Sequence, residues 1–417
     1  MKKIIFTLLI IQFTMLIANA QWIQQDSLTN QALLDVSFIN RNTGWTSGRN
    51  GTILKTTNGG NNWINQNSGA SNKSLYGLSS VNSNVIYCVG WFETILKSTN
   101  GGDNWIIIKN GLVGGGHSYW GVYFINENTG WICGSGLIIF KTTNGGLSFD
   151  STFMPIAHAR DVYFRNPIEG LVCGEGAGMC RTTDGGTSWT QIVMPVGNEA
   201  ADFYKMTFID NNIGFTQGVG NNKVYKTTTF GISWDSIARV PGADESYCIF
   251  FSSLNTGYCA GTYGRMFKTT NGGYNWRQEN LLKFNTAFIN SLYFYNDSIG
   301  WAVGGAGKIL FTSNGGQQLV QISNNNEQIP DKFQLFQNYP NPFNPTTKIE
   351  FNIAKLSDVK IIVYDMMGRE VQTLVNESLK PGTYETSFDA SQLPSGVYFY
   401  RLTTENYSET KKMILMK

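Results

Sequence analysis

Short runs of alternating apolar and polar residues recur along most of the chain and predict β-strands rather than helices. One run is Val36-Ser-Phe38, a second starts at Gly44 and a third starts at Ile53. This order returns at intervals of about 40–45 residues, each time ending in a phrase close to Lys-Thr-Thr-Asn-Gly-Gly-x-x-Trp. The seven phrases begin at Lys55, Lys97, Lys141, Arg181, Lys226, Lys268 and Phe311.

A repeat of this length and strand content is typical of one blade of a β-propeller, because a four-stranded blade must stack on neighbours to bury its faces. Within each repeat we expect strand a at Val-x-Phe, strand b at Gly-Trp-x-x-Gly, strand c at Ile-Leu-Lys-Thr and strand d at Trp. The sequence therefore predicts an all-β protein with a seven-bladed propeller over residues 21–322.

The seventh repeat lacks a clear strand d, since Leu319 stands where the Trp is expected. Residues 22–27, Trp-Ile-Gln-Gln-Asp-Ser, repeat the strand-d text that follows Trp63, with no strand a, b or c before them. We expect this N-terminal strand to complete the seventh blade and close the ring, which would remove two open sheet edges. The alternative is that residues 319–322 supply the missing strand.

The first twenty residues have the order of a signal peptide. Lys2 and Lys3 come first, residues 4–17 are mostly apolar, and Ala18-Asn-Ala20 offers a cleavage site. A membrane anchor is the alternative, but the apolar run is too short to span the bilayer. We expect export, with a mature chain that begins at Gln21 and has no transmembrane segment.

A second domain follows a polar linker at residues 323–330. Alternating strands are expected at 348–354, 359–365, 383–388 and 396–403, separated by Gly- and Pro-containing turns. This pattern predicts a small Ig-like antiparallel β-sandwich over residues 331–417.

Composition narrows the possible chemistry. The 31 basic and 29 acidic residues are dispersed and the net charge is +2, so no nucleic-acid partner is expected. Six Cys without a C-x-x-C pair and two His argue against a metal site, and no cofactor is expected. Buried thiols are the favoured state of the Cys, with Cys173–Cys180 and Cys248–Cys259 as possible disulfides.

The Thr56-x-Asn58-x-Gly60-x-x-Trp63 phrase resembles the Asp-box, or bacterial neuraminidase repeat, and the whole blade text resembles the photosystem II assembly and stability factor family of propellers. We expect a structural role: the Asn accepts backbone N–H bonds, the Gly adopts positive φ, and Trp63 packs against the next blade. The box residues are Asn58, Gly60, Trp63, Asn100, Gly102, Trp105, Asn144, Gly146, Asp184, Gly186, Trp189, Asn271, Gly273 and Trp276.

Candidate ligand-binding residues lie on the opposite face, at the channel mouth. Period-two alternation places one residue per strand a there, and the b–c loops add more. The candidates are Tyr76, Trp91, Trp120, Arg160, Tyr204, Tyr247, Tyr263 and Arg265. Aromatic and Arg residues at a concave mouth suit a glycan or a peptide, although they could equally plug the channel.

No catalytic residues are assigned. The acidic residues near the mouth are Asp35, Glu93, Asp161, Glu175, Asp202 and Glu245, and no spacing singles out a catalytic pair. We therefore expect a non-enzymatic binding or scaffold module. The alternative is a secreted glycoside hydrolase of the sialidase-like or xyloglucanase-like kind.

The C-terminal domain carries the most specific signal. Its phrases Asn338-Tyr-Pro-Asn-Pro-Phe-Asn, Val363-Tyr-Asp-Met-Met-Gly-Arg and Leu393-Pro-Ser-Gly-Val-Tyr closely resemble the type A sorting domain of the type IX (Por) secretion system. That resemblance implies recognition by the type IX machinery and a secreted or cell-surface destination. The alternative is an ordinary fibronectin-like carbohydrate-binding sandwich.

Overall fold

A computed structural model of the chain describes residues 22–109, 111, 116–197, 199–242, 246–279, 281, 287–316, 320–321, 330–390 and 393–416. The expected signal peptide and all but the last residue of the expected linker lie outside them. The only helical segments in the described residues are the short 3-10 turns η1 (Arg49–Gly51), η2 (Thr262–Gly264) and η3 (Gly305–Gly307). In that same part of the chain, no helix is long and apolar enough to cross a membrane.

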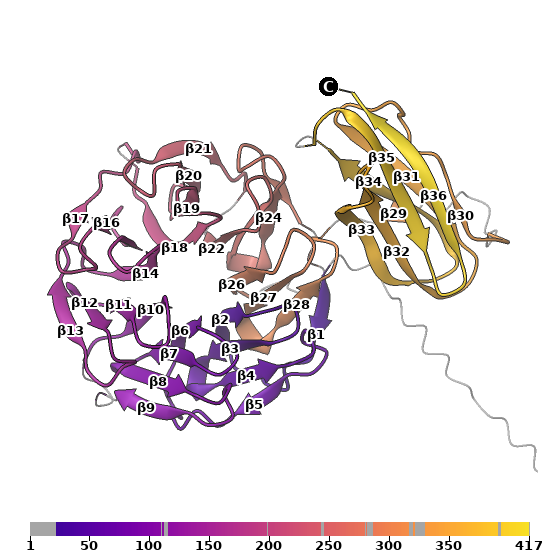
Figure 1. Ribbon diagram of the computed structural model, residues 1–417. Helices are drawn as coiled ribbons and strands as arrows, with labels where there is room; N and C mark the ends of the chain where they lie inside the picture. The colour runs from indigo at the N-terminus through magenta and orange to yellow at the C-terminus, as the bar shows by residue number, and fades with distance from the viewer. Residues whose placement is uncertain are drawn as a thin grey trace, which may run out of the picture.

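Seven antiparallel four-stranded sheets form a ring of blades (Figure 1). Blade 1 contains β2 (Leu33–Phe38), β3 (Gly44–Gly48), β4 (Ile53–Thr56) and β5 (Ile64–Gln66). Blade 2 contains β6 (Leu75–Ser80), β7 (Ile86–Gly90), β8 (Thr94–Ser98) and β9 (Ile106–Lys109). Blade 3 contains β10 (Tyr119–Phe124), β11 (Gly130–Gly134), β12 (Ile138–Thr142) and β13 (Asp150–Phe153). Blade 4 contains β14 (Ala159–Phe164), β15 (Gly170–Gly174), β16 (Met179–Thr182) and β17 (Thr190–Gln191); blade 5 contains β18 (Asp202–Phe208), β19 (Gly214–Val219), β20 (Lys223–Thr227) and β21 (Asp235–Arg239). Blade 6 contains β22 (Ser246–Phe251), β23 (Gly257–Gly261), β24 (Met266–Thr269) and β25 (Arg277–Gln278); blade 7 contains β26 (Ile289–Phe294), β27 (Gly300–Gly304), β28 (Ile309–Thr312) and β1 (Ile23–Gln25).

Burial follows the order of strands within a blade. The second strand is buried along nearly its whole length in every blade, because it lies between two neighbouring blades and inside its own sheet. The fourth strand is largely exposed at the rim. The predicted all-β fold of a seven-bladed propeller is confirmed.

The seventh blade takes its fourth strand from the N-terminus. Ile23 lies opposite Phe311 and Gln25 lies opposite Ile309, so β1 occupies the edge beside β28. Residues 320–321 form β29 (Val320–Gln321), which pairs instead with β34 (Gly382–Asp389) of the C-terminal domain. These two residues were assigned to the propeller from the sequence; they join the sandwich because β1 already fills the place beside β28.

The C-terminal domain is a sandwich of two antiparallel sheets, as predicted. One sheet has the order β29-β34-β31-β30 and the other β33-β32-β35-β36. The remaining strands are β30 (Gln334–Leu335), β31 (Thr346–Ile353), β32 (Ser357–Tyr364), β33 (Glu370–Leu379), β35 (Gly396–Thr403) and β36 (Ser408–Leu415). Residues such as Phe351, Ile361 and Tyr384 fill one apolar core between the sheets. The sequence prediction missed β30, which has two residues, and also β33 and β36, in which runs of polar residues interrupt the alternation.

Hydrogen bonds join described residues of the two domains. The Ser313 hydroxyl donates to the Asn376 carbonyl over 2.9 Å, and the Thr270 hydroxyl lies 3.5 Å from the Asp389 carboxylate. Thr270 lies in the turn between the third and fourth strands of blade 6, and Ser313 directly follows β28, the third strand of blade 7. The sandwich stands next to these two blades in Figure 1.

All six cysteines are buried free thiols. Cys173 lies opposite Met179 and Cys248 lies opposite Ala260, so neither of the two possible disulfide pairs is in direct cross-strand register.

Candidate functional site

The two faces of the ring carry different turns and loops. In blade 1 the amide of Gly59, in the c–d turn, donates to the carbonyl of Asn42, in the a–b turn, over 2.8 Å. The same bond recurs in the other blades, for example from Gly101 to Asn84 and from Gly272 to Asn255. The Asp-boxes and the a–b turns therefore share one face, called here the box face. The b–c and d–a loops emerge on the opposite face.

Each Asp-box is a closed hydrogen-bonded turn. In blade 1 the Thr56 hydroxyl accepts the amide of Gly60 over 2.8 Å, and the Asn58 side-chain oxygen accepts the amide of Asn62 over 2.9 Å. Gly60 has φ +88°, and a Cβ there would come within 2.0 Å of the Gln25 side chain. Matching bonds occur in the other blades, and Asp184 replaces Asn in blade 4. Hydrogen bonds to Ser188 lower the pKa of Asp184 to about 2. Even the degenerate box of blade 5 keeps the turn, because the Thr229 hydroxyl accepts the amide of Ser233 over 3.1 Å.

The box Trp of blade 1 packs against the preceding blade, not the following one. The Trp63 ring meets Phe38 edge to face at 5.9 Å and shares a core cluster with Trp301 of blade 7. Its indole N–H donates to Gln25 of β1 over 3.1 Å. The expectation of contact with the next blade was therefore wrong, because the face of blade 1 that carries Phe38 is turned towards blade 7.

Contact with the following blade comes from a residue that the sequence analysis did not single out, the aromatic of strand b. The indole of Trp45 in blade 1 donates to the box carbonyl of Gly101 in blade 2 over 3.0 Å. Trp131 and Tyr258 make the equivalent bonds to Gly185 and Gly315. The recurring Gly-Trp of strand b was the sequence signal that could have indicated this contact. The boxes thus bind neighbouring blades together and do not converge on one point.

On the opposite face, five of the predicted residues line the start of the innermost strands. Each of Tyr76, Trp120, Arg160, Tyr204 and Tyr247 is half-buried. In every blade the register of the first two strands shifts at this residue. Such bulges re-aim a side chain, so the simple period-two alternation used for the sequence prediction does not hold here.

Four of these residues form a continuous stacked ladder across blades 3 to 6. The Arg160 guanidinium lies 3.9 Å from the Trp120 ring centre and 4.8 Å from that of Tyr204. Tyr204 stacks on Tyr247, with centroids 5.6 Å apart and planes 8° apart. Phe288 extends the ladder at 6.2 Å from Tyr247. The sequence analysis missed Phe288, because it lies in a d–a loop with no repeating position.

The remaining candidates form two smaller groups. Tyr76 meets Trp91 edge to face at 6.2 Å. Arg265 lies over the ring of Tyr263 at 5.8 Å, on the b–c turn of blade 6. Trp91 and Tyr263 are both exposed, so this face also offers aromatic surface beyond the ladder.

A charged layer lies directly behind the ladder, at the next residue along the inner strands. The Lys205 ammonium lies 3.7 Å from the Asp161 carboxylate and 3.9 Å from that of Asp35, on the non-adjacent blade 1. Asp35 also accepts the Ser291 hydroxyl over 2.7 Å. Each carboxylate accepts a backbone amide of the following blade, that of Leu78 or Met206, over 2.9 Å. The layer therefore joins blades 1, 2, 4, 5 and 7 around the ring axis.

Ionisation of this layer depends on burial and on its opposite charges. Burial raises the pKa of Asp161, and the Lys205 ammonium partly offsets the effect. Burial opposes the charge of Lys205, but Asp161 and Asp35 outweigh it and raise the pKa of the ammonium above its usual range. The lysine is therefore a permanent cation between two carboxylates.

Replacing Lys205 with methionine is expected to lower the free energy of unfolding by about 2 kcal/mol at neutral pH, because two buried carboxylates lose their shared cation. Without the cation the pKa of Asp161 rises further. A carboxyl group whose pKa is raised by folding stabilises the folded state at low pH. That contribution is lost as the pH rises through the raised pKa. The deficit in the free energy of unfolding relative to the wild type should therefore shrink as the pH is lowered from about 8 to about 5, as measured by urea unfolding. Lys360→Met, at an exposed lysine, is the control; a Lys205→Met penalty that grows towards pH 5 would contradict this expectation.

The acidic residues named near the mouth have partners in the described structure. Glu93 pairs with Lys109 at 3.1 Å, and Glu175 pairs with Arg160. Asp202 accepts the amide of Gly176 over 2.8 Å. Glu245 lies outside the described residues. Within the described part of the chain, no three His, Cys, Asp or Glu residues come together as metal ligands would.

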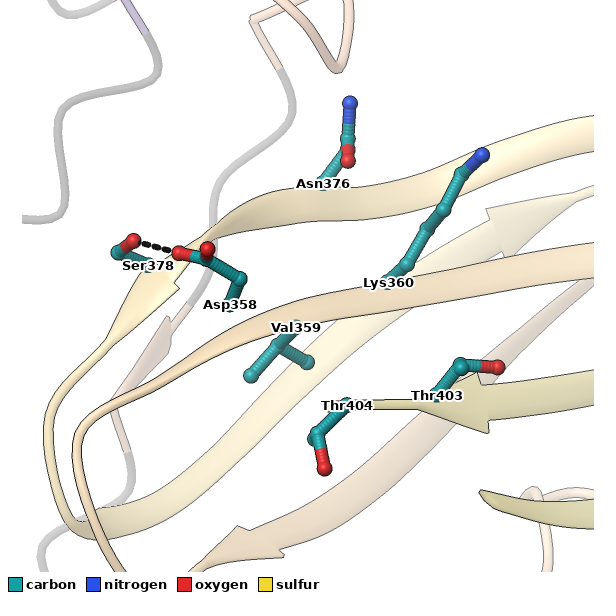
Figure 2. A pocket seen from close by; sticks show the side chains of 7 residues that line it. All are labelled: Asp358, Val359, Lys360, Asn376, Ser378, Thr403 and Thr404. Carbon is teal, nitrogen blue, oxygen red and sulfur yellow. Dashed lines mark hydrogen bonds between the residues drawn. The ribbon is translucent and has the colours of Figure 1, made fainter. Parts of the chain in front are cut away.

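A polar groove of about 450 Å³ lies on the C-terminal domain. Figure 2 shows Asp358 and Lys360 on β32 facing Ser378 and Asn376 on β33, with Val359 pointing the other way. Thr403 and Thr404 complete the lining. The hydrogen bond between Asp358 and Ser378 spans one end. The groove forms because alternate side chains of the paired strands β32 and β33 point to the same face of the sheet. The contact between Ser313 and Asn376 places the propeller beside it.

Seven blades held together by Asp-boxes, with a separate two-sheet sandwich, define an Asp-box β-propeller fused to a C-terminal β-domain. Residues 15–119, 113–238 and 227–341 match the family described as photosynthesis system II assembly factor YCF48, and the chain belongs to that family. Residues 337–416 match the secretion system C-terminal sorting domain. The chain therefore carries a tail that directs type IX secretion to the cell surface or beyond.

Solved structures agree on the propeller fold. A structure titled YCF48 bound to D1 peptide has 20% identity and a TM-score of 0.59, covering 70% of this chain and 96% of that one. YCF48 from Cyanidioschyzon merolae has 20% identity and a TM-score of 0.58, covering 70% and 98%. The WD40 propeller domain of Doa1 has 12% identity and a TM-score of 0.54, covering 70% and 95%. No curated protein matches the sequence.

Proposed function

We propose that this protein is a non-enzymatic binding propeller, exported by the type IX route, and that it holds a peptide segment of a partner protein on the ladder face. The observation that carries the proposal is the stacked ladder of Trp120, Arg160, Tyr204 and Tyr247 at the start of the inner strands. Clustered aromatic and Arg side chains at the centre of a face are typical of binding hot spots.

The stacking favours a peptide over a glycan. A sugar binds an aromatic side chain by lying on an open ring face, whereas the faces of Tyr204 and Tyr247 lie against each other and Arg160 lies between two rings. The ladder therefore offers ring edges, which suit the backbone and the apolar side chains of a peptide. The structural relative titled as bound to a D1 peptide supports the same class of ligand.

The ligand is expected to be uncharged where it meets the ladder. The charge of Arg160 is matched by Glu175, and Lys205 offsets one of the two carboxylates behind it. Neither layer has a large excess of one sign, so a free carboxylate or phosphate gains little there.

Tyr204→Ala and Tyr247→Ala are each expected to weaken peptide binding about tenfold, because each removes a ring from the centre of the ladder. Short synthetic peptides tiled over surface proteins of the host, on an array beside a glycan array, would identify ligands for the mature full chain. Affinities of the peptide hits would then be measured in solution. Tyr295→Ala removes an exposed tyrosine from the box face and should leave binding unchanged. Binding to glycans alone, or equal loss in all three variants, would refute the proposal.

A further inference from the structure

The exposed apolar side chains of the C-terminal domain are unevenly placed. Its described residues include five large exposed apolar side chains, Tyr339 (81% exposed), Leu356 (65%), Met366 (74%), Met367 (77%) and Met416 (56%). Exposed apolar groups scattered singly need no explanation, but a concentration of them marks an interaction surface.

Four of the five lie at one end of the sandwich, as strand register shows. Met416 follows Leu415, the last residue of β36. Leu415 pairs with Gly396 at the start of β35, and it also forms a bridge to Phe343, just before β31. Tyr339 pairs with Lys348 near the start of β31. The turn with both Met366 and Met367 follows β32, whose last residue, Tyr364, pairs with Phe399 of β35. This group, Tyr339, Met366, Met367 and Met416, is called here the methionine end. Leu356 lies at the other end, between β31 and β32.

The methionine turn is rigid although its side chains are exposed. One carboxylate oxygen of Asp365 accepts the amides of Met367 and Arg369 over 2.8 and 3.0 Å, and the other accepts the Arg369 guanidinium over 2.7 Å. The turn thus carries no unpaired charge beside the two methionines. These hydrogen bonds hold its backbone, and both methionines are largely exposed.

The segment that presents Tyr339 is fixed in the same way. The neighbouring Asn338 is buried and donates to Pro340 and Thr347 over 3.0 and 2.9 Å, and its amide donates to the Tyr400 hydroxyl over 2.7 Å. Phe343 is buried against the end of β36. The Asn-Tyr-Pro-Asn-Pro-Phe phrase therefore builds this end, and Tyr339 is its outward-facing member.

We infer that the methionine end is the surface by which the type IX machinery binds this domain, through an apolar recess on an outer-membrane component. The inference rests on the proposed export route, because a sorting domain needs a partner. Met side chains are flexible and polarisable, and such surfaces adapt to partners.

The test uses the full-length protein in a host with type IX machinery. The double variant Met366→Ser/Met367→Ser and the single variant Tyr339→Ser are expected to reduce the exported fraction about tenfold and to accumulate in the periplasm. Leu356→Ser removes a comparably exposed side chain from the other end and should be exported normally. Thermal unfolding of each purified variant should match the wild type, because none of these side chains is buried.

Three results would overturn the inference: normal export of both methionine-end variants, equal retention of the Leu356→Ser control, or retention with a lowered melting temperature. Sedimentation of the purified chain tests self-association. A dimer that the double variant disrupts, with export intact, would assign this end to a second copy. If removal of the whole domain leaves export unchanged, the proposed route itself fails, which is a different result from failure of the surface alone.

Discussion

Trp63→Ala is expected to lower the free energy of unfolding by about 3–5 kcal/mol, the range for removal of a large buried aromatic side chain. Trp63 is 2% exposed and packs against both Phe38 and the cluster around Trp301. Its loss also leaves the Gln25 side-chain oxygen, on β1, without the indole donor. Because β1 closes the ring, the substitution weakens the junction of blades 1 and 7 as well as blade 1. Urea denaturation of the purified chain from residue 21 onward would measure the loss.

Trp91→Ala is the matched control, since Trp91 is an exposed tryptophan on the ladder face. It should lower the free energy of unfolding by about 1 kcal/mol or less, because Trp91 is exposed and its edge contact with Tyr76 is of modest strength. A Trp63→Ala variant that keeps full stability but loses a binding activity would show that the box contacts a ligand. The bonds between boxes and neighbouring blades would then be secondary to another role.

The blades could be predicted from the sequence because their determinants are local. Two-residue alternation, the Asn-Gly-Gly turn and the recurrence of Gly-Trp fix each four-stranded sheet, and seven copies fix the number of blades. Position along the strand also assigned Trp120, Arg160, Tyr204 and Tyr247 to one end of the inner strands. The bulges at these residues left no mark in the pattern, since a bulge adds a residue without changing residue type.

Features that depend on ring geometry were beyond the sequence. Lys205 meets Asp35 only because blades 5 and 1 face each other around one axis, and no repeat position pairs them. The direction in which Trp63 packs follows from which face of blade 1 is turned towards blade 7. Phe288 and the short β29 lie in connecting segments, whose course is set by tertiary contacts rather than by periodicity.

Deletion of residues 317–417 is expected to leave a folded propeller that is retained in the periplasm. The ring closes through pairing of β1 with β28, so its sheets do not need the sandwich. Among the described residues, the deletion removes the hydrogen bond from Ser313 to Asn376 and the weak one from Thr270 to Asp389. Exposed hydrogen bonds of this kind contribute at most about 1 kcal/mol. The cut is placed before β29 because residues 320–321 belong to the sandwich.

Cell fractionation and thermal unfolding would measure the outcome, with the full-length chain as reference. In the reciprocal experiment, residues 317–417 fused to a reporter with its own signal peptide should export it in a host with type IX machinery and fail in a host without it. Including β29 should matter: a fusion that starts at residue 331 lacks the strand beside β34, leaves that sheet edge open and should be exported less efficiently. Normal export of the truncated propeller, together with a large loss of its stability, would make the C-terminal domain a structural partner of the ring and refute its role as a sorting signal.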